Sequence, residues 1–136
     1  MKAFPLTRRR LLALIGPGVL AVAAARAGDG PRGALVMFRR RGCPWCDAWD
    51  SEVRPGYVAS EAGRRLPVRD LDLDRDRDHG IALVRPVRFT PTFVVVETAP
   101  GGGLAGATEL LRIEGYPGAE FFWGYIDAFL DNWPDG

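Results

Sequence analysis

Two cysteines follow directly on an apolar run, and this arrangement restricts the fold more than any other feature of the chain. Cys43 and Cys46 are the only cysteines among 136 residues, and every residue of the preceding run, 34–38, is apolar. Such a run is typical of a strand that is covered on both faces. Pro44 is tolerated in the first turn of a helix. The sequence therefore predicts a strand that delivers Cys43 to the start of a helix.

A helix that starts beside Cys43 favours the thiolate form of its side chain. The first turn of a helix presents unpaired N–H groups and the positive end of the helix dipole. Arg39, Arg40 and Arg41 add positive charge close by. Thiols in such surroundings react as nucleophiles. We therefore expect Cys43 to be the nucleophile and Cys46, one turn into the helix, to be the resolving thiol.

Two other uses of the cysteine pair fit the sequence less well. A structural zinc site needs four ligands, and apart from carboxylates the chain offers only His79 in addition to the cysteines, so we predict no metal site. A purely structural disulfide that closes so short a loop would constrain little of the unfolded chain. We therefore expect a redox-active disulfide between Cys43 and Cys46, which needs no separate cofactor.

The first 27 residues have the pattern of a bacterial export signal. They carry five cationic side chains and no acid. The apolar segment over residues 11–25 is shorter than the ~20 residues of a membrane-spanning helix, and Ala25-Arg26-Ala27 matches a small-x-small cleavage motif. We predict a signal peptide over 1–27, cleaved after Ala27 and exported by the twin-arginine or the general secretory route, with an uncleaved anchor as the alternative. The protein would then be periplasmic, where a C-x-x-C reductant must be actively kept reduced.

Residues 28–136 are expected to form one domain. Without the leader, 13 cationic residues remain against 17 acidic ones, so the net charge changes from +1 to about −4. This balance does not favour nucleic-acid binding, which needs a basic face. A domain of this length can bury a core without disulfides, which leaves the cysteines free for chemistry. We expect a monomer.

The rest of the chain alternates between strand and helix patterns. A helix from Pro44 is interrupted at Pro55-Gly56 and followed by a second helical piece over 57–66. Strands are predicted over 67–74, after Thr90-Pro91 and over 109–113, with a short helix over 80–84 and a loop over 99–106. A last helix presents one face to the core, formed by Phe122, Tyr125, Ile126, Phe129, Leu130 and Trp133.

The aspartates between residues 70 and 78 alternate with other residues, as calcium ligands do in a binding loop. The run lacks the glycine and the terminal glutamate that an EF-hand requires. Arg75 and Arg77 lie within it, so we expect a solvated, self-paired charge run. His79, which follows it, is expected to be a surface or helix-start residue.

The order β-α-β-α-β-β-α resembles the thioredoxin fold, an α/β architecture with a central mixed sheet and flanking helices. Three local features match: Cys43-Pro44-Trp45-Cys46, Thr90-Pro91 before a strand, and Gly115 after the last strand. The resemblance implies a cis bond before Pro91 and a client protein that pairs, as an added strand, with the backbone at Thr90. The client-binding residues are then Trp45, Thr90, Pro91 and Gly115.

The same resemblance indicates which residues adjust the redox potential. Pro44 and Trp45 lie between the cysteines, and Arg41 and Pro91 are expected beside them. Cytosolic-type thioredoxins carry a buried acid on the first strand, whereas this chain has Met37 at the matching position. Proton exchange with the resolving cysteine must therefore use another group or water.

Longer stretches are similar to the SoxS-type periplasmic thioredoxins of bacterial sulfur-oxidation operons. They are residues 42–50 (GCPWCDAWD), 63–65 (GRR), 85–93 (RPVRFTPTF) and 114–118 (EGYPG). The resemblance implies a thiol–disulfide oxidoreductase that reduces a cysteine-bearing carrier protein of the thiosulfate-oxidising system and is itself reduced by a membrane thiol reductant. Two alternatives stay open: an oxidant or cytochrome-maturation reductant with another client, and a regulatory binding protein whose cysteines only sense redox state.

Overall fold

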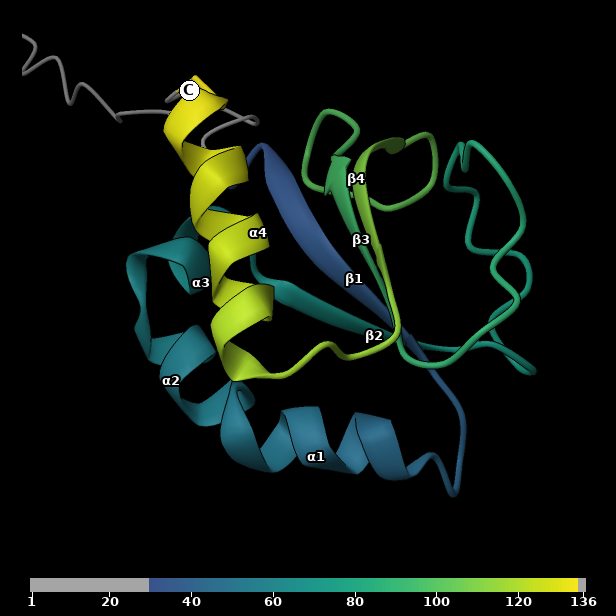
Figure 1. The fold of residues 1–136 in the computed structure, drawn as a ribbon. Coiled ribbons are helices and arrows are strands. Elements are labelled where there is room, and N and C mark those ends of the chain that lie inside the picture. The colour runs from purple at the N-terminus through teal and green to yellow at the C-terminus, as the bar shows by residue number, and fades with distance from the viewer. Residues whose placement is uncertain (1–29, 135–136) are drawn as a thin grey trace, which may run out of the picture.

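Four strands form one mixed sheet in the order β2-β1-β3-β4 (Figure 1). The strands are β1 (Gly33–Arg39), β2 (Val68–Asp72), β3 (Thr92–Glu97) and β4 (Thr108–Glu114). β1 pairs with β2 in parallel, and β3 runs antiparallel to both of its neighbours. This computed structural model describes residues 30–134, so the predicted signal peptide and its cleavage after Ala27 lie outside the described residues.

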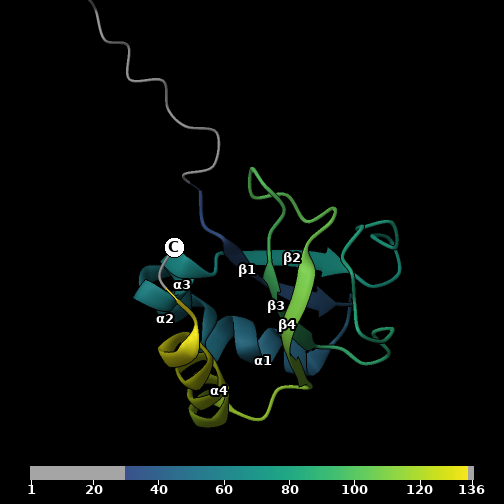
Figure 2. The same cartoon turned by 90° about the horizontal axis from the view of Figure 1, so that it is seen from above.

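All four helices lie on one face of this sheet (Figures 1 and 2). Three of them, α1 (Pro44–Glu52), α2 (Arg54–Ala59) and α3 (Glu61–Arg65), connect β1 to β2, and α4 (Ala119–Asn132) follows β4. The interruption of the first helix occurs at Val53, which ends α1 and caps α2, and not at Pro55-Gly56 as predicted. Pro55 and Gly56 lie in the first turn of α2, where the missing N–H of a proline is tolerated. Ser60 interrupts the helical backbone a second time, between α2 and α3. Its hydroxyl caps α3 by accepting from the Gly63 N–H at 3.1 Å.

The two faces of β1 belong to two separate clusters of buried side chains. Leu35 and Met37 pack among the helices, whereas Ala34, Val36 and Phe38 pack on the opposite face. Each of these residues is 2% exposed or less, which confirms the strand predicted from the apolar run. Loops rather than helices cover the second face. Leu71 of β2 also packs there, and the apolar residues of the loops are Leu73, Ile81, Leu83, Val87, Leu104 and Ala107.

The predicted helix over 80–84 is wrong. This segment is extended and pairs with the edge of the sheet: Ala82 bridges to Thr108 in parallel, its N–H donates to the Ala107 carbonyl at 2.8 Å, and its own carbonyl accepts from Glu109 N–H. His79 does not begin a helix either, since its Nδ1 accepts from the Ile81 N–H at 3.0 Å. The apolar residues of this segment cover a sheet face, and an extended backbone serves that purpose as well as a helix would.

The last helix packs through an aromatic cluster. Phe122 lies against Trp49, Tyr57 and Phe93, with ring centroids 5.0–6.1 Å apart. The core-facing stripe is as predicted except at Tyr125, which is 52% exposed. Trp123, which was not predicted to face the core, packs on Tyr57, with the two ring centroids 5.6 Å apart. Within residues 30–134, no helix combines the length and the apolar character needed to cross a membrane.

The aspartate run forms a hydrogen-bonded turn. Asp72 Oδ1 accepts from the N–H groups of Asp74 and Arg75, and Asp76 Oδ2 accepts from the Asp72 N–H. These bonds and the neighbouring arginines hold the pKa of Asp72 below its usual value. These two carboxylates therefore serve the backbone of the turn. The predicted self-pairing is wrong for Asp70 and Asp74, because their ion pairs are with Arg54 and Arg40, which lie outside the run.

The two ends of the described fold meet at the start of β1. The Trp133 ring lies so close to Gly33 that a Cβ atom there would be 2.5 Å from it. The Arg65 guanidinium donates to the Trp133 carbonyl at 2.9 Å and lies over the Trp133 ring. Gly33 is therefore needed because the C-terminal end of the fold is docked against it.

Candidate active site

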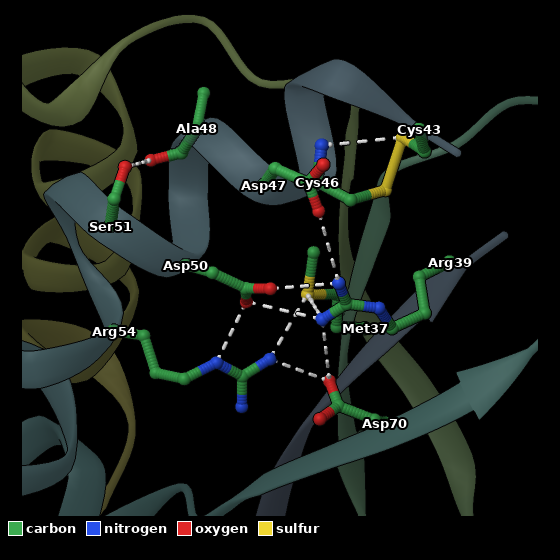
Figure 3. Close-up of polar contacts among 10 residues, drawn as sticks. All are labelled: Met37, Arg39, Cys43, Cys46, Asp47, Ala48, Asp50, Ser51, Arg54 and Asp70. Carbon is green, nitrogen blue, oxygen red and sulfur yellow. Dashed lines mark hydrogen bonds and ion pairs between the residues drawn. A yellow bond between two sulfur atoms is a disulfide. The ribbon is translucent and has the colours of Figure 1, made fainter. Parts of the chain in front are cut away.

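The two cysteines lie where β1 ends and α1 begins, and they form a disulfide. Cys43 is the N-cap of α1, with an extended backbone, and its Sγ accepts from the Cys46 N–H at 3.2 Å (Figure 3). Pro44 occupies the first turn, where its missing N–H leaves no bond unmade. The helix start thus directs an N–H group at the first sulfur, as the sequence predicts.

Only one of the two cysteines is accessible from outside. Cys43 retains 8% of its surface, whereas Cys46 is fully buried. Trp45, between them, is 63% exposed. Gly42 turns the chain into the helix with φ of +74°, a conformation that favours glycine. A partner molecule therefore meets the Cys43 sulfur and the Trp45 ring together.

Pro91 and Gly115 lie at the same end of the sheet as the disulfide. The strand register places Phe38, at the end of β1, opposite Thr92, and Thr92 opposite Glu114. The Thr90–Pro91 bond is cis, which is the isomer expected from the sequence, and the Pro91 carbonyl accepts from the Gly115 N–H at 2.8 Å. Within residues 30–134, no backbone group bonds to the N–H or carbonyl of Thr90. Those two groups therefore stay available to an added strand.

A charged cluster lies beside the disulfide on the inner side of α1 (Figure 3). We call Arg39, Asp50, Arg54 and Asp70 the α1 cluster. Asp50 accepts two bonds from Arg39, at 2.7 and 3.1 Å, and one from Arg54 at 2.8 Å. Arg54 also donates to Asp70 at 2.8 Å. Side chains from β1, α1, α2 and β2 are joined in this way.

The α1 cluster changes the expected electrostatics of the site. Arg39 is bound to Asp50 and has Asp47 and Asp70 within 4.0 Å, and Arg40 pairs with Asp74 at 3.2 Å. Their charges are thus largely balanced by carboxylates. Of the three consecutive arginines, only Arg41 has no ion pair with another of the described residues. The positive charge beside Cys43 is therefore smaller than the sequence alone predicts.

Met37 lies at the inner end of this cluster. Its side chain is fully buried with the cysteines in the same apolar group, and its sulfur accepts from Arg54 at 3.5 Å and, more weakly, from Arg39 at 3.9 Å. Burial would raise the pKa of Asp50, but the hydrogen bonds from the two arginines outweigh it and lower that pKa. Asp50 stays ionised at neutral pH and is a poor proton acceptor, so it does not replace the missing buried acid.

No metal site accompanies these groups. Within the described part of the chain, no three His, Cys, Asp or Glu side chains are placed to hold a metal ion. His79 lies edge-on to the Phe38 ring at 5.4 Å, and its Nδ1 is used by the Ile81 N–H.

The comparison with known proteins identifies the family. The periplasmic thioredoxin SoxS from Paracoccus pantotrophus, in its reduced form, has 38% identity and a TM-score of 0.61 with this chain, over 73% of this chain and 96% of SoxS. The chain belongs to the thioredoxin superfamily. This thioredoxin-like protein is a thiol–disulfide oxidoreductase, and its redox disulfide joins Cys43 and Cys46.

Other comparisons add little to this assignment. The Malassezia sympodialis thioredoxin Mala s 13 has 17% identity and a TM-score of 0.47, over 75% of this chain and 77% of that protein. No protein-family model and no curated protein matches the chain.

Two residues of the α1 cluster were not singled out by the sequence analysis. Asp50, in α1, and Arg54, in α2, are four positions apart in the sequence, and an acid four residues before an arginine is a known pairing signal in helices. That signal could have identified the pair. Nothing in the local sequence indicates that Arg39 and Asp70, on two different strands, join it.

Proposed function

We propose that this protein reduces a disulfide or cysteine adduct on a client protein. The observation that supports this most is the placement of Cys43, which is the more exposed of the two cysteines and whose sulfur accepts an N–H bond at the helix start. In the reduced protein, the Cys43 thiolate attacks a client sulfur, forms a mixed disulfide and expels the other client sulfur as a thiolate, which takes up a proton. Cys46 then loses its proton and attacks Cys43, which closes the Cys43–Cys46 disulfide and releases the second client sulfur as a thiol. Two electrons pass to the client.

We propose that the client lies across Trp45, Thr90, Pro91 and Gly115. The free backbone groups of Thr90 support this placement, because an extended peptide can pair with them. The exposed Trp45 ring supplies apolar contact beside the reactive sulfur. Pro44 acts on the reactive sulfur by starting the helix, and Arg41, whose charge also acts on Asp72, adds positive charge two residues before Cys43.

We further propose that the mature protein is a periplasmic monomer of residues 28–136. The relative SoxS is described as periplasmic, and residues 1–27 have the pattern of an export signal. The client would be the cysteine-bearing carrier protein of a thiosulfate-oxidising system, and a membrane thiol reductant would restore the dithiol. Mass spectrometry of protein taken from the periplasm should show an N-terminus at Gly28. An intact Met1 would refute the cleavage.

Trapping of the mixed disulfide tests the function. Cys46→Ser removes the resolving thiol, so the variant should accumulate a covalent complex with its client that dithiothreitol releases. Cys43→Ser is the matched control and should trap nothing. If Cys46→Ser yields no covalent complex in the native periplasm, the proposed reduction of a client protein is refuted.

The helix start favours a second candidate, a thiol oxidant. An N–H bond to the Cys43 sulfur stabilises the thiolate, and hence the reduced form, which raises the reduction potential. Equilibration with glutathione buffers separates the two directions. A reductant requires a potential well below the ~−120 mV of a dedicated periplasmic oxidant, and a value near that figure would assign the protein to oxidation.

A further inference from the structure

The segment before Pro91 lies along the outer edge of β4. It begins with main-chain pairing, in which Ala82 bridges to Thr108 and accepts from the Glu109 N–H at 3.2 Å. From Val84 onward, no main-chain bond of the described residues joins this segment to β4. Its position must therefore depend on side chains.

Four charged residues, which we call the β4 cluster, replace the missing main-chain bonds: Arg85, Glu109, Arg112 and Glu114. Glu109 accepts from the Val84 N–H at 2.8 Å. Arg112 donates to the carbonyl of Arg85 at 2.6 Å and, less closely, to that of Pro86 at 3.4 Å. Arg85 in turn pairs with Glu114 at 2.7 Å. The backbone of three consecutive residues, 84–86, is thus bonded to side chains of β4.

The centre of the β4 cluster is a buried pair. The side chains of Arg112 and Glu109 are each only 6% exposed, and two N–H groups of the guanidinium meet the two carboxylate oxygens at 2.8 and 2.9 Å. A planar guanidinium held on two sides cannot turn away without leaving a buried charge unpaired. The pair is therefore a rigid support for the backbone that it binds.

The supported segment continues directly into the client-binding residues. Four residues, 87–90, lie between Pro86 and Pro91, and the Pro91 carbonyl accepts from the N–H of Gly115, the residue after β4. β4 and the turn after it thus hold the segment at both ends. Between these points Arg88 and Phe89 are exposed, and among the described residues the Phe89 carbonyl is held by one hydrogen bond, which it accepts from the Thr92 hydroxyl at 2.8 Å.

We propose that Arg112 and Glu109 are positioning residues, which hold residues 84–91 in the conformation that the client meets. They touch neither sulfur nor client in this assignment, and they act through the backbone of the segment. The inference rests on the proposed function, because it takes Thr90 and Pro91 to be client-binding. It assigns the support of that surface to a charged pair on β4.

The double variant Glu109→Leu with Arg112→Met tests the proposal. A buried ion pair can be replaced by apolar residues of similar size with little loss of stability, so the variant should fold while losing the bonds to residues 84–86. With insulin as the disulfide substrate, we expect KM to rise about tenfold and kcat to change less than twofold. Alkylation of reduced Cys43 by iodoacetamide should keep its wild-type rate, and the Val84 amide, which loses its bond to Glu109, should exchange faster with deuterium.

Arg32→Ala is the matched control. It removes an ion pair, Arg32 with Glu97 at 3.3 Å, that is about half exposed and lies at the other end of β3, and it should leave KM unchanged. An unchanged KM in the double variant overturns the positioning role, as does a KM change accompanied by an altered alkylation rate. A wild-type protein that cannot reduce insulin refutes the proposed function, and the inference falls with it.

Discussion

The α1 cluster and the β4 cluster have the same chemistry and differ in their contact with water. Each joins two arginines to two carboxylates. In the α1 cluster every side chain keeps between 25% and 42% of its surface, whereas the Glu109–Arg112 pair of the β4 cluster keeps 6%. Exposed ion pairs contribute little to stability, while loss of one partner of a buried pair costs several kcal/mol. The first cluster is therefore suited to balance charge beside the disulfide, and the second to hold a backbone in place.

The largest effect should follow from breaking the buried pair on one side only. Arg112→Ala leaves the Glu109 carboxylate buried without its partner, and we expect the free energy of unfolding to fall by about 3–5 kcal/mol. Urea denaturation at pH 7 measures it. The double variant Glu109→Leu with Arg112→Met should recover most of this loss. A single variant as stable as the wild type would show that the two clusters do not differ as their burial indicates.

The second largest effect should be a difference between the two clusters in how the free energy of unfolding depends on pH. Burial opposes the ionised form of Glu109, but bonds from Arg112 and from the Val84 N–H lower its pKa in the folded state, and Asp50 is lowered similarly. A carboxyl with a lowered folded pKa stabilises the protein above its unfolded pKa, and this stability is lost as the pH falls through the folded value.

Urea midpoints measured from pH 7 down to pH 3 should therefore decrease most steeply for the wild type. The decrease should be shallower in the Glu109→Leu with Arg112→Met variant and slightly shallower in Asp50→Asn. Parallel profiles in all three proteins would contradict this ranking.

Removing the shared carboxylate of the α1 cluster should have a smaller effect on stability. Asp50→Asn weakens bonds to two arginines, but the partly exposed groups gain water in exchange, so we expect a loss of about 1 kcal/mol. Asp74→Asn, in the exposed pair with Arg40, is the control and should stay within about 0.5 kcal/mol of the wild type. A loss as large as that of Arg112→Ala would mean that water does not screen the α1 cluster.

The smallest effect should be on the reduction potential. Asp50→Asn leaves an excess positive charge on the inner side of α1, which favours the thiolate and so raises the potential, by about 10–20 mV given that 30 mV corresponds to about 1.4 kcal/mol. Equilibration with glutathione measures the shift, and Asp74→Asn should show none. A lower potential in Asp50→Asn would mean that the α1 cluster does not act on the sulfurs through its charge.

The parts of the fold that were predictable from sequence have strong local patterns. The buried strand over 34–38, the helix that begins at Pro44 and the interruption before Tyr57 depend on apolar runs and on proline chemistry. The prediction of a helix over 80–84 is wrong because the apolar residues of this segment cover a sheet face. A short apolar run does not distinguish a strand from a helix. The order of the elements around it is otherwise as expected.

The same limit applies to the site. The sulfur pair, the helix start and the isomer of the Thr90–Pro91 bond follow from motifs of adjacent residues. The charges around them do not, because Arg39 meets Asp70 and Arg112 meets the Arg85 carbonyl only after the strands are paired. Three consecutive arginines predict one positive patch, whereas the folded chain gives Arg39 and Arg40 separate carboxylate partners.

The docking of Trp133 against Gly33 places both ends of the described fold at the end of β1 that is opposite the disulfide. β1 has seven residues, so at about 3.3 Å per residue the disulfide lies roughly 20 Å along the strand from the end where both termini of the described fold meet. A fluorescent protein or an affinity tag joined directly to either end of the described fold, at residue 30 or residue 134, is thus attached opposite the end of the molecule that carries the disulfide. Protein immobilised through its ends presents the redox face outward, which suits surface-based capture of the client.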